Sequence, residues 1–404
     1  MFLLQQKQTF HIFLFFIYKN FLIDNSIKLS DNNDINKKKC QNRFWGFSMK
    51  KTLLILSACL CFFTSCQKKQ ELKPVNIKPI TIEQDGCTIV SDPRLELLLI
   101  ASNLAGFYPT GNTNSDYVST IHTFFKNHKE HALIKQIKKI TKKYTYYIDY
   151  LMIFNCISED FTTISEETLH NSAKNYWKKH KDQFLKNFNS FAHDTNFAKF
   201  YLAYEHALKA PLFHAEDYFN TNPTIIPNIN SILTKNNNQK QIIYSSNLAF
   251  SNFPTTIPNT LILENKPNKE NPFTKFFLFS NLLYNSIFKS IEENWEQLKE
   301  PITTFVKTLY EQNKITLKIE DTNTILSCSD IMSFYLTYHF TAKDFPEEIN
   351  TEIYEFLKKQ YLYDFYTIFK PIFQEYEQNP EKYASFEEFF NNYLVNEIIN
   401  ISLN

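Results

Sequence analysis

The histidines are the residues of this chain best suited to metal binding and acid–base chemistry. His128 and His131 stand three residues apart in HTFFKNHKEH, a spacing that brings two ring nitrogens to one face of a helix. Lys126 and Lys129 alternate with them, and the sequence places no aspartate nearby. We therefore expect a solvated helix face here rather than a metal site.

Other candidate catalytic and binding residues are scattered along the chain. We expect His193, His206 and His214 at surface positions or helix ends. Triads of serine, histidine and aspartate, or of cysteine and histidine, remain open because these residue types are present. Arg94, close to Glu96 in DPRLEL, fits either a structural ion pair or a ligand clamp, and we favour the ion pair.

Composition excludes several classes of protein. The chain has 4 glycines in 404 residues and none after Gly111, whereas average usage is about 7%. A P-loop, a Rossmann phosphate loop and a nucleophile elbow all need glycine, so these are excluded. From Cys66 onward the net charge is about −5 and Arg94 is the only arginine, which argues against a nucleic-acid partner.

The elements that must position these residues are mostly helices. Asp92-Pro93 is a good start for a helix that stops at Gly106. Between Asn220 and Asn265 the pattern changes to short apolar runs separated by turn residues, which predicts a small sheet at about 241–264. The other predicted helices are 115–131, 132–143, 146–156, 165–190, 194–209, 273–298, 300–313, 327–342, 346–369 and 385–400.

A segment near the start concerns the protein's location. Met49 opens MKKTLLILSACLCFFTSCQKK, in which two lysines precede the apolar run Thr52 to Phe63, too short to span a bilayer as a helix. The segment resembles a bacterial lipoprotein signal peptide, 49–65. Phe63-Thr64-Ser65-Cys66 is similar to a lipobox, which implies cleavage before Cys66 and lipidation of its sulfur; Cys59 is the weaker alternative.

The regions on either side of this signal are expected to be unstructured. Residues 1–48 are interpreted as an upstream extension that is not native or is disordered, and 66–90 as a polar tether. The folded domain is therefore expected to be 91–404. Cys87, Cys156 and Cys328 are an odd number of cysteines without a CxxC motif, and we expect buried thiols rather than a disulfide or metal framework.

The order of these elements, with several local segments, resembles a bacterial lipoprotein family of unknown function whose members are similar to zincin metallopeptidases. The segments are DPRLELLLIASNLAGF, HDTNFAKFYLAYEH, the strands before Pro272, and QYLYDFYTIFKPIF. Members of that family carry HExxH on the helix after the strands. Its two histidines bind Zn²⁺ from one helix face, and its glutamate polarises the attacking water.

The corresponding segment here is FFLFSNLLYNSIF, and no HExxH occurs in the chain. Ser280, Asn281 and Tyr284 stand at the positions of the first histidine, the glutamate and the second histidine. Serine and tyrosine are poor zinc ligands and asparagine is no general base, so the motif is degenerate. The resemblance implies a third ligand near Asp330, but we favour a helix N-cap as the role of this residue.

These observations predict an α+β, predominantly helical protein: a zincin-like helical domain with a small sheet before the degenerate active-site helix. We expect a lipid-anchored protein of a bacterial envelope, at the periplasmic face or cell surface, without a catalytic or metal site or a cofactor. Its role would be to bind peptide or protein, or to serve structurally; its oligomeric state stays open. The alternatives are an active metallopeptidase with other ligands and a helical lipoprotein that captures glycans or peptides.

Overall fold

The computed structural model describes residues 71–108, 115–143, 147–165, 171–233, 240–254, 257, 259–312, 321–361, 364–379 and 381–403. The chain divides into two units, Met1–Lys73 and Pro74–Asn404. The elements given below all lie in Pro74–Asn404, which contains its own sheet and core. Cys66, the predicted signal peptide 49–65 and the extension 1–48 lie outside the described residues.

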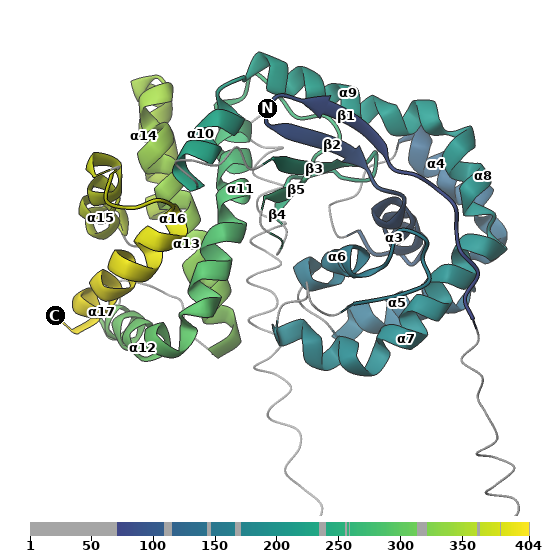
Figure 1. The fold of residues 1–404 in the computed structure, drawn as a ribbon, viewed down its shortest axis with the longest axis horizontal. Helices are drawn as coiled ribbons and strands as arrows, with labels where there is room; N and C mark the ends of the chain where they lie inside the picture. The colour runs from purple at the N-terminus through teal and green to yellow at the C-terminus, as the bar shows by residue number, and fades with distance from the viewer. Residues whose placement is uncertain are drawn as a thin grey trace, which may run out of the picture. The chain divides into compact units, whose positions relative to one another are not determined.

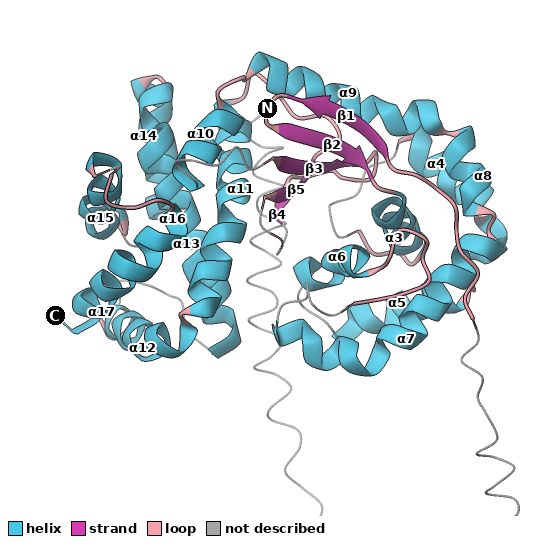
Figure 2. Ribbon diagram, in the orientation of Figure 1, coloured by secondary structure: helices cyan, strands magenta, loops and turns pink. Residues whose placement is uncertain are grey.

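Five strands form one mixed sheet in the order β1-β2-β3-β5-β4 (Figure 2). The strands β3 (Gln241–Ser245), β4 (Phe253–Pro254) and β5 (Thr260–Leu263) confirm the predicted sheet at 241–264. β2 (Cys87–Ser91), β3 and β5 run parallel, with Val90 opposite Tyr244 and Tyr244 opposite Ile262. The outer strands β1 (Ile80–Gln84) and β4 are antiparallel to their neighbours.

The prediction of a tether over 66–90 was wrong for its second half, because β1 and β2 are part of the sheet. Gln84 pairs with Cys87, so only Asp85 and Gly86 form the turn between the two strands. Asp-Gly is a strong signal for a two-residue hairpin turn, in which glycine supplies a positive φ. Gly86 has φ +73°, as such a turn requires.

Helices fill the crossover between β2 and β3. Asp92 caps α3, its Oδ1 accepting a hydrogen bond from the Arg94 N–H at 2.8 Å, and Gly106 with φ +74° follows the helix end, as predicted. The predicted helix 194–209 is two helices, α8 and α9, that meet at Tyr204. The helices are α3 (Pro93–Leu104), α4 (Asp116–Phe124), α5 (Ala132–Lys143), α6 (Tyr147–Cys156), α7 (Asn171–Asp194), α8 (Phe197–Ala203), α9 (Glu205–Thr221) and α10 (Ile225–Leu233), with the short 3₁₀ turn Lys126–His128.

Helices also make up the chain after β5. Asn271 caps α11 and Pro272 is its first residue, a favourable start because proline lacks the N–H that the first helical turn leaves unpaired. The predicted helix 346–369 is interrupted, and α14 and α15 take its place. The elements are α11 (Pro272–Glu293), α12 (Trp295–Glu311), α13 (Asp321–Thr341), the 3₁₀ turn Ala342–Asp344, α14 (Glu347–Tyr361), α15 (Tyr366–Gln378), α16 (Phe386–Phe389), a π-helical turn Phe390–Leu394 and α17 (Val395–Leu403).

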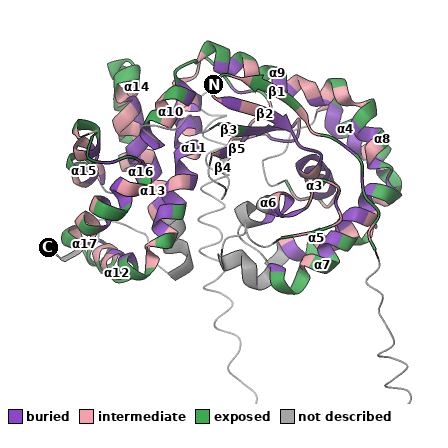
Figure 3. Cartoon of the chain, viewed as in Figure 1, coloured by how far each residue is buried: buried purple, intermediate pink, exposed green. Residues whose placement is uncertain are grey.

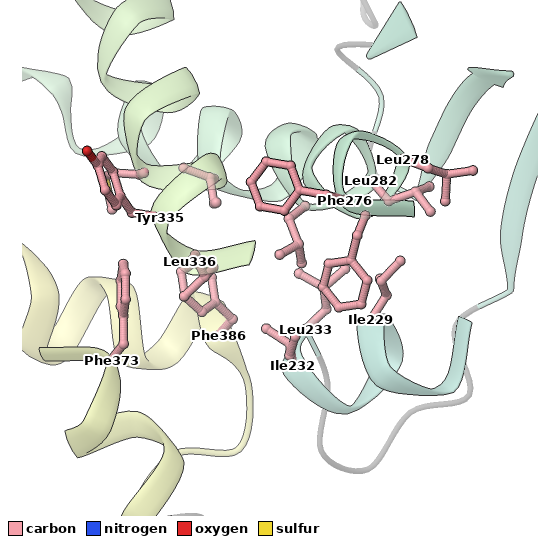
Figure 4. Close-up of a cluster of buried hydrophobic side chains, with 14 of the residues drawn as sticks. Ile229, Ile232, Leu233, Phe276, Leu278, Leu282, Tyr335, Leu336, Phe373 and Phe386 are labelled. Atoms are coloured by element: carbon pink, nitrogen blue, oxygen red, sulfur yellow. The ribbon is translucent and has the colours of Figure 1, made fainter. Parts of the chain in front are cut away.

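One large apolar core joins the sheet to the helices that follow it. α9 contacts β1, β2 and β3, and α11 contacts β4, β5, α10 and α13 (Figure 1). Figure 4 shows side chains of α10 and α11 meeting those of α13, α15 and α16, with Phe276 and Leu336 among them. α3 is buried along almost its whole length (Figure 3). The protein is therefore an α+β protein made mainly of helices, as predicted.

Candidate functional site

Ser280, Asn281 and Tyr284, the positions singled out by the sequence resemblance, lie on α11, the helix that follows β5. The Nδ2 of Asn285 donates a hydrogen bond to the carbonyl oxygen of Thr260 in β5 at 2.7 Å, which fixes one side of α11 to the sheet. Another side of α11 packs against α13, where the rings of Phe276 and Phe334 stack with centroids 6.0 Å apart. The helix that carries the sequence-predicted site therefore lies between the sheet and a second long helix.

The structure brings Ser280 and the region of Asp330 to the same interface. Ser280 Oγ donates to Ser333 Oγ at 3.3 Å, and both side chains are buried. Ser333 Oγ also donates to the carbonyl oxygen of Asp330 at 2.9 Å. Asp330 lies inside α13 (Asp321–Thr341), so the expectation of a helix N-cap was wrong. Residues three apart share a helix face, so Asp330 lies on the side of α13 that faces α11. Burial raises the pKa of the Asp330 carboxyl to about 7.

The other two positions of the motif differ from each other in exposure. Tyr284 is buried and its ring stacks on that of Phe288 at a centroid distance of 5.8 Å. Asn281 is half-buried. Ser280 and Tyr284, four residues apart, lie on one helix face as two zinc ligands would, but they offer a hydroxyl and a phenol in place of two imidazoles.

A metal ion needs several converging donors, and this interface supplies one carboxylate. Within the ranges that the structure describes, no three histidine, cysteine, aspartate or glutamate side chains are grouped so that they could hold a metal ion. Ser280 lies against Ser333, and both side chains are buried. The contact between the Ser280 and Ser333 hydroxyls is part of the packing of α11 on α13.

His131 has an aspartate partner, contrary to the expectation from its sequence neighbours. Its Nε2 lies 3.2 Å from Oδ2 of Asp194, at the end of α7, and 3.4 Å from Oγ of Ser190. The Leu133 N–H donates to His131 Nδ1 at 3.1 Å, so Nδ1 is an acceptor. Nε2 then carries the proton that it donates to Asp194 and is unable to take one from Ser190. Serine, histidine and aspartate meet here without forming a catalytic triad.

The remaining candidate histidines are at the surface, as predicted: His193, His206 and His214 are exposed, whereas His128 is half-buried. The sequence interpretation missed His339, which lies between α13 and α15. Its Nδ1 is 3.2 Å from the Tyr366 hydroxyl, and its Nε2 is 3.3 Å from Glu377. Burial is the main cause that lowers the pKa of His339. These contacts join two helices and bring no further ligand or nucleophile to the ring.

Arg94 makes the structural ion pair that was favoured from the sequence. Its Nε and NH2 donate to the two oxygens of Asp92 at 3.0 and 2.6 Å, and its NH1 donates to the Ile157 carbonyl at 2.8 Å. The bidentate pair fixes the start of α3, and the third bond ties it to the end of α6. All three contacts are within the protein, so the guanidinium serves packing.

Glu96 forms a buried cluster that the sequence interpretation did not recognise. Its carboxylate is 1% exposed and accepts hydrogen bonds from the hydroxyls of Tyr117 and Ser246, both at 2.6 Å. Burial raises the pKa of Glu96, and the two hydrogen bonds oppose that rise. The available signal was a charged residue inside LELLLIASNL, since a helix that is apolar on all sides must bury any charge it contains.

The three cysteines of the described residues are free thiols. Cys87 and Cys156 are buried as expected, and Cys328 is half-buried. Burial raises the pKa of Cys87 to about 11 and that of Cys328 to about 12. Such thiols are protonated at neutral pH and are poor nucleophiles, so these two residues are unsuited to catalysis.

Two further observations bear on the class of protein. None of the helices in the described ranges combines the length and the apolar character that a membrane span requires. No protein-family model matches the chain, and comparisons with curated proteins and with solved structures give no significant match either.

Proposed function

We propose that this protein is a lipid-anchored bacterial envelope protein whose folded unit is a peptidase-like scaffold without catalytic activity. The observation that carries the proposal is the contact of Ser280 with Ser333, 3.3 Å apart. The sequence resemblance puts the first zinc ligand of an HExxH motif at Ser280. A buried hydroxyl pair there replaces the imidazole and the metal that hydrolysis would need.

The arrangement of the sheet supports this scaffold over an all-helical capture protein. β5 directly precedes α11, and α11 contacts both β5 and β4. A strand pair beside this helix is expected of the peptidase-like architecture, whereas a capture protein of the all-helical class would have helices here. The unit then serves to bind peptide or to hold a position in the envelope. Measurements of zinc binding and of metal-dependent peptide hydrolysis test the proposal that the folded unit has no catalytic activity.

The lipid anchor makes a separate prediction. In a bacterial host grown with labelled palmitate, the full chain incorporates label, and Cys66→Ser abolishes the incorporation because the acylated sulfur is lost. Cys59→Ser, which removes the weaker candidate, leaves the label in place. Gel fluorography of the immunoprecipitated protein measures both results. Label that persists in Cys66→Ser and disappears in Cys59→Ser assigns the anchor to the other cysteine and refutes this part of the proposal.

A further inference from the structure

Two segments of the folded unit are rich in lysine, a feature that the overall charge of the chain conceals. Residues 126–143 and 171–194 contain twelve lysines and three acidic residues, a net charge of +9, whereas the chain from Cys66 onward carries about −5. Most of these residues form α5 and α7, which pack against each other. These two neighbouring helices are therefore richer in lysine than the chain as a whole.

Side-chain contacts show how the lysines are arranged around the seam between these helices. Asn187 Nδ2 of α7 donates to Gln136 Oε1 of α5 at 2.6 Å, and Gln183 Nε2 donates to Asn187 Oδ1 at 2.9 Å. Lys139 is one helical turn from Gln136, and Lys179 is one turn from Gln183. We call the exposed lysines of these two helices the lysine surface: Lys135, Lys138, Lys139, Lys178, Lys179 and Lys186.

The first residues of the folded unit are fixed next to α7. The Val75 N–H donates to the Asp160 carbonyl at 2.9 Å. The adjoining Phe161 carbonyl accepts a hydrogen bond from Asn189 Nδ2 of α7 at 3.1 Å, and the rings of Phe161 and Phe188 are 5.3 Å apart. Asn189 is one helical turn from Lys186. The chain that leads back to Cys66 thus leaves the folded unit beside α7.

We propose that the lysine surface docks on the anionic headgroups of the membrane to which the protein is anchored. The proposal rests on the proposed anchor for its geometry: Cys66 is nine residues before Val75, and nine residues span at most about 30 Å. The 24-residue helix α7 is itself about 36 Å long, so such an anchor keeps the lysine surface close to the bilayer.

The charge of the lysine surface also fits an anionic lipid occupant. A lysine close to an anionic bilayer strengthens binding about fivefold, and several lysines on one surface act together within the screening length of the salt. Nucleic acid is the other polyanion that a lysine-rich face attracts. The position of Val75 beside α7 favours the membrane, since the anchored chain brings this face to lipid before any soluble partner.

The test measures sedimentation of the unlipidated chain with vesicles. Residues 67–404 contain the whole sheet and core, so this chain keeps the folded unit. We expect binding to vesicles of phosphatidylcholine with about 30% phosphatidylglycerol, no binding to phosphatidylcholine alone, and loss of binding at about 0.5 M salt. The quadruple variant Lys138→Gln, Lys139→Gln, Lys179→Gln, Lys186→Gln loses at least tenfold in vesicle partitioning.

A matched control removes four exposed lysines elsewhere: Lys266→Gln, Lys307→Gln, Lys359→Gln and Lys370→Gln. It should bind as the unmodified chain does, and circular dichroism should show all three proteins folded. Equal loss in both variants, equal binding to neutral vesicles, or tighter binding to duplex DNA than to anionic vesicles overturns the proposal. Residues 67–404 lack Cys66, so the vesicle result does not depend on the anchor. If the full chain carries no palmitate label at Cys66, the anchor is refuted and the vesicle result still stands.

Discussion

Glu96→Ala should lower the free energy of unfolding by about 3 kcal/mol, because it leaves two buried hydroxyls without an acceptor. In the folded protein the Glu96 carboxylate joins α3 to Tyr117 in α4 and to Ser246 just after β3. Removing the Glu96 side chain also leaves a cavity beside α3, in which almost every residue is buried. Urea unfolding followed by circular dichroism measures the loss.

Glu96→Gln is the matched control, since it keeps the volume and one acceptor oxygen and should cost clearly less. It also tests the raised pKa of Glu96. An acid with a raised pKa in the folded state contributes most stability below its unfolded pKa and loses that contribution as the pH rises through the folded pKa. The stability of the natural protein relative to Glu96→Gln should therefore increase from pH 8 to pH 5. A difference that stays constant or moves the other way would contradict the burial of this carboxyl.

Gly86→Ala should destabilise the protein by about 2 to 3 kcal/mol, for two reasons. Gly86 has φ +73°, which alanine tolerates poorly, and an added Cβ would lie 2.7 Å from Cγ2 of Ile226. Ile226 is 4% exposed in α10, so its branched side chain has little room to move away. Thermal or urea unfolding of the variant gives the cost.

Gly106 provides the control for the cost of the positive φ alone, because it has φ +74° and a Cβ added there would meet no atom within 4 Å. Gly106→Ala should cost about 1 kcal/mol. In an Ile226→Ala background the added cost of Gly86→Ala should fall to the same level, as the clashing methyl group is gone. Equal costs at Gly86 and Gly106 in the natural background would show that the hairpin does not pack on α10 as described.

The fold was predictable where local signals and tertiary packing agree. Asp92-Pro93 and Gly106 bound α3 as expected, and the apolar runs at 241–264 are strands. The hairpin of β1 and β2 was missed, although Asp85-Gly86 signals it, because the segment follows a polar stretch that looks like a tether. β2 is a central strand only through its pairing with β3, about 150 residues later, and no local pattern encodes such a contact.

The contacts of the candidate site residues could not be predicted from the sequence. Ser280 and Asp330 were singled out from a motif, and the structure places them at one interface through Ser333, which carried no signal of its own. Glu96 was noted beside Arg94, but its partners Tyr117 and Ser246 are 21 and 150 residues away. His131 acquired Asp194 in the same way, from a helix distant in sequence.

We expect α11 to carry no zinc site, and the zinc content of the purified protein tests this expectation most directly. Residues 67–404 would be purified, exposed to zinc, dialysed, and analysed for metal, with hydrolysis of a casein substrate measured on the same sample. Ser280, Asn281 and Tyr284 offer no imidazole and no carboxylate, so we expect well under one zinc per chain and no hydrolysis that a chelator abolishes. One tightly held zinc per chain, with chelator-sensitive hydrolysis, would contradict the account.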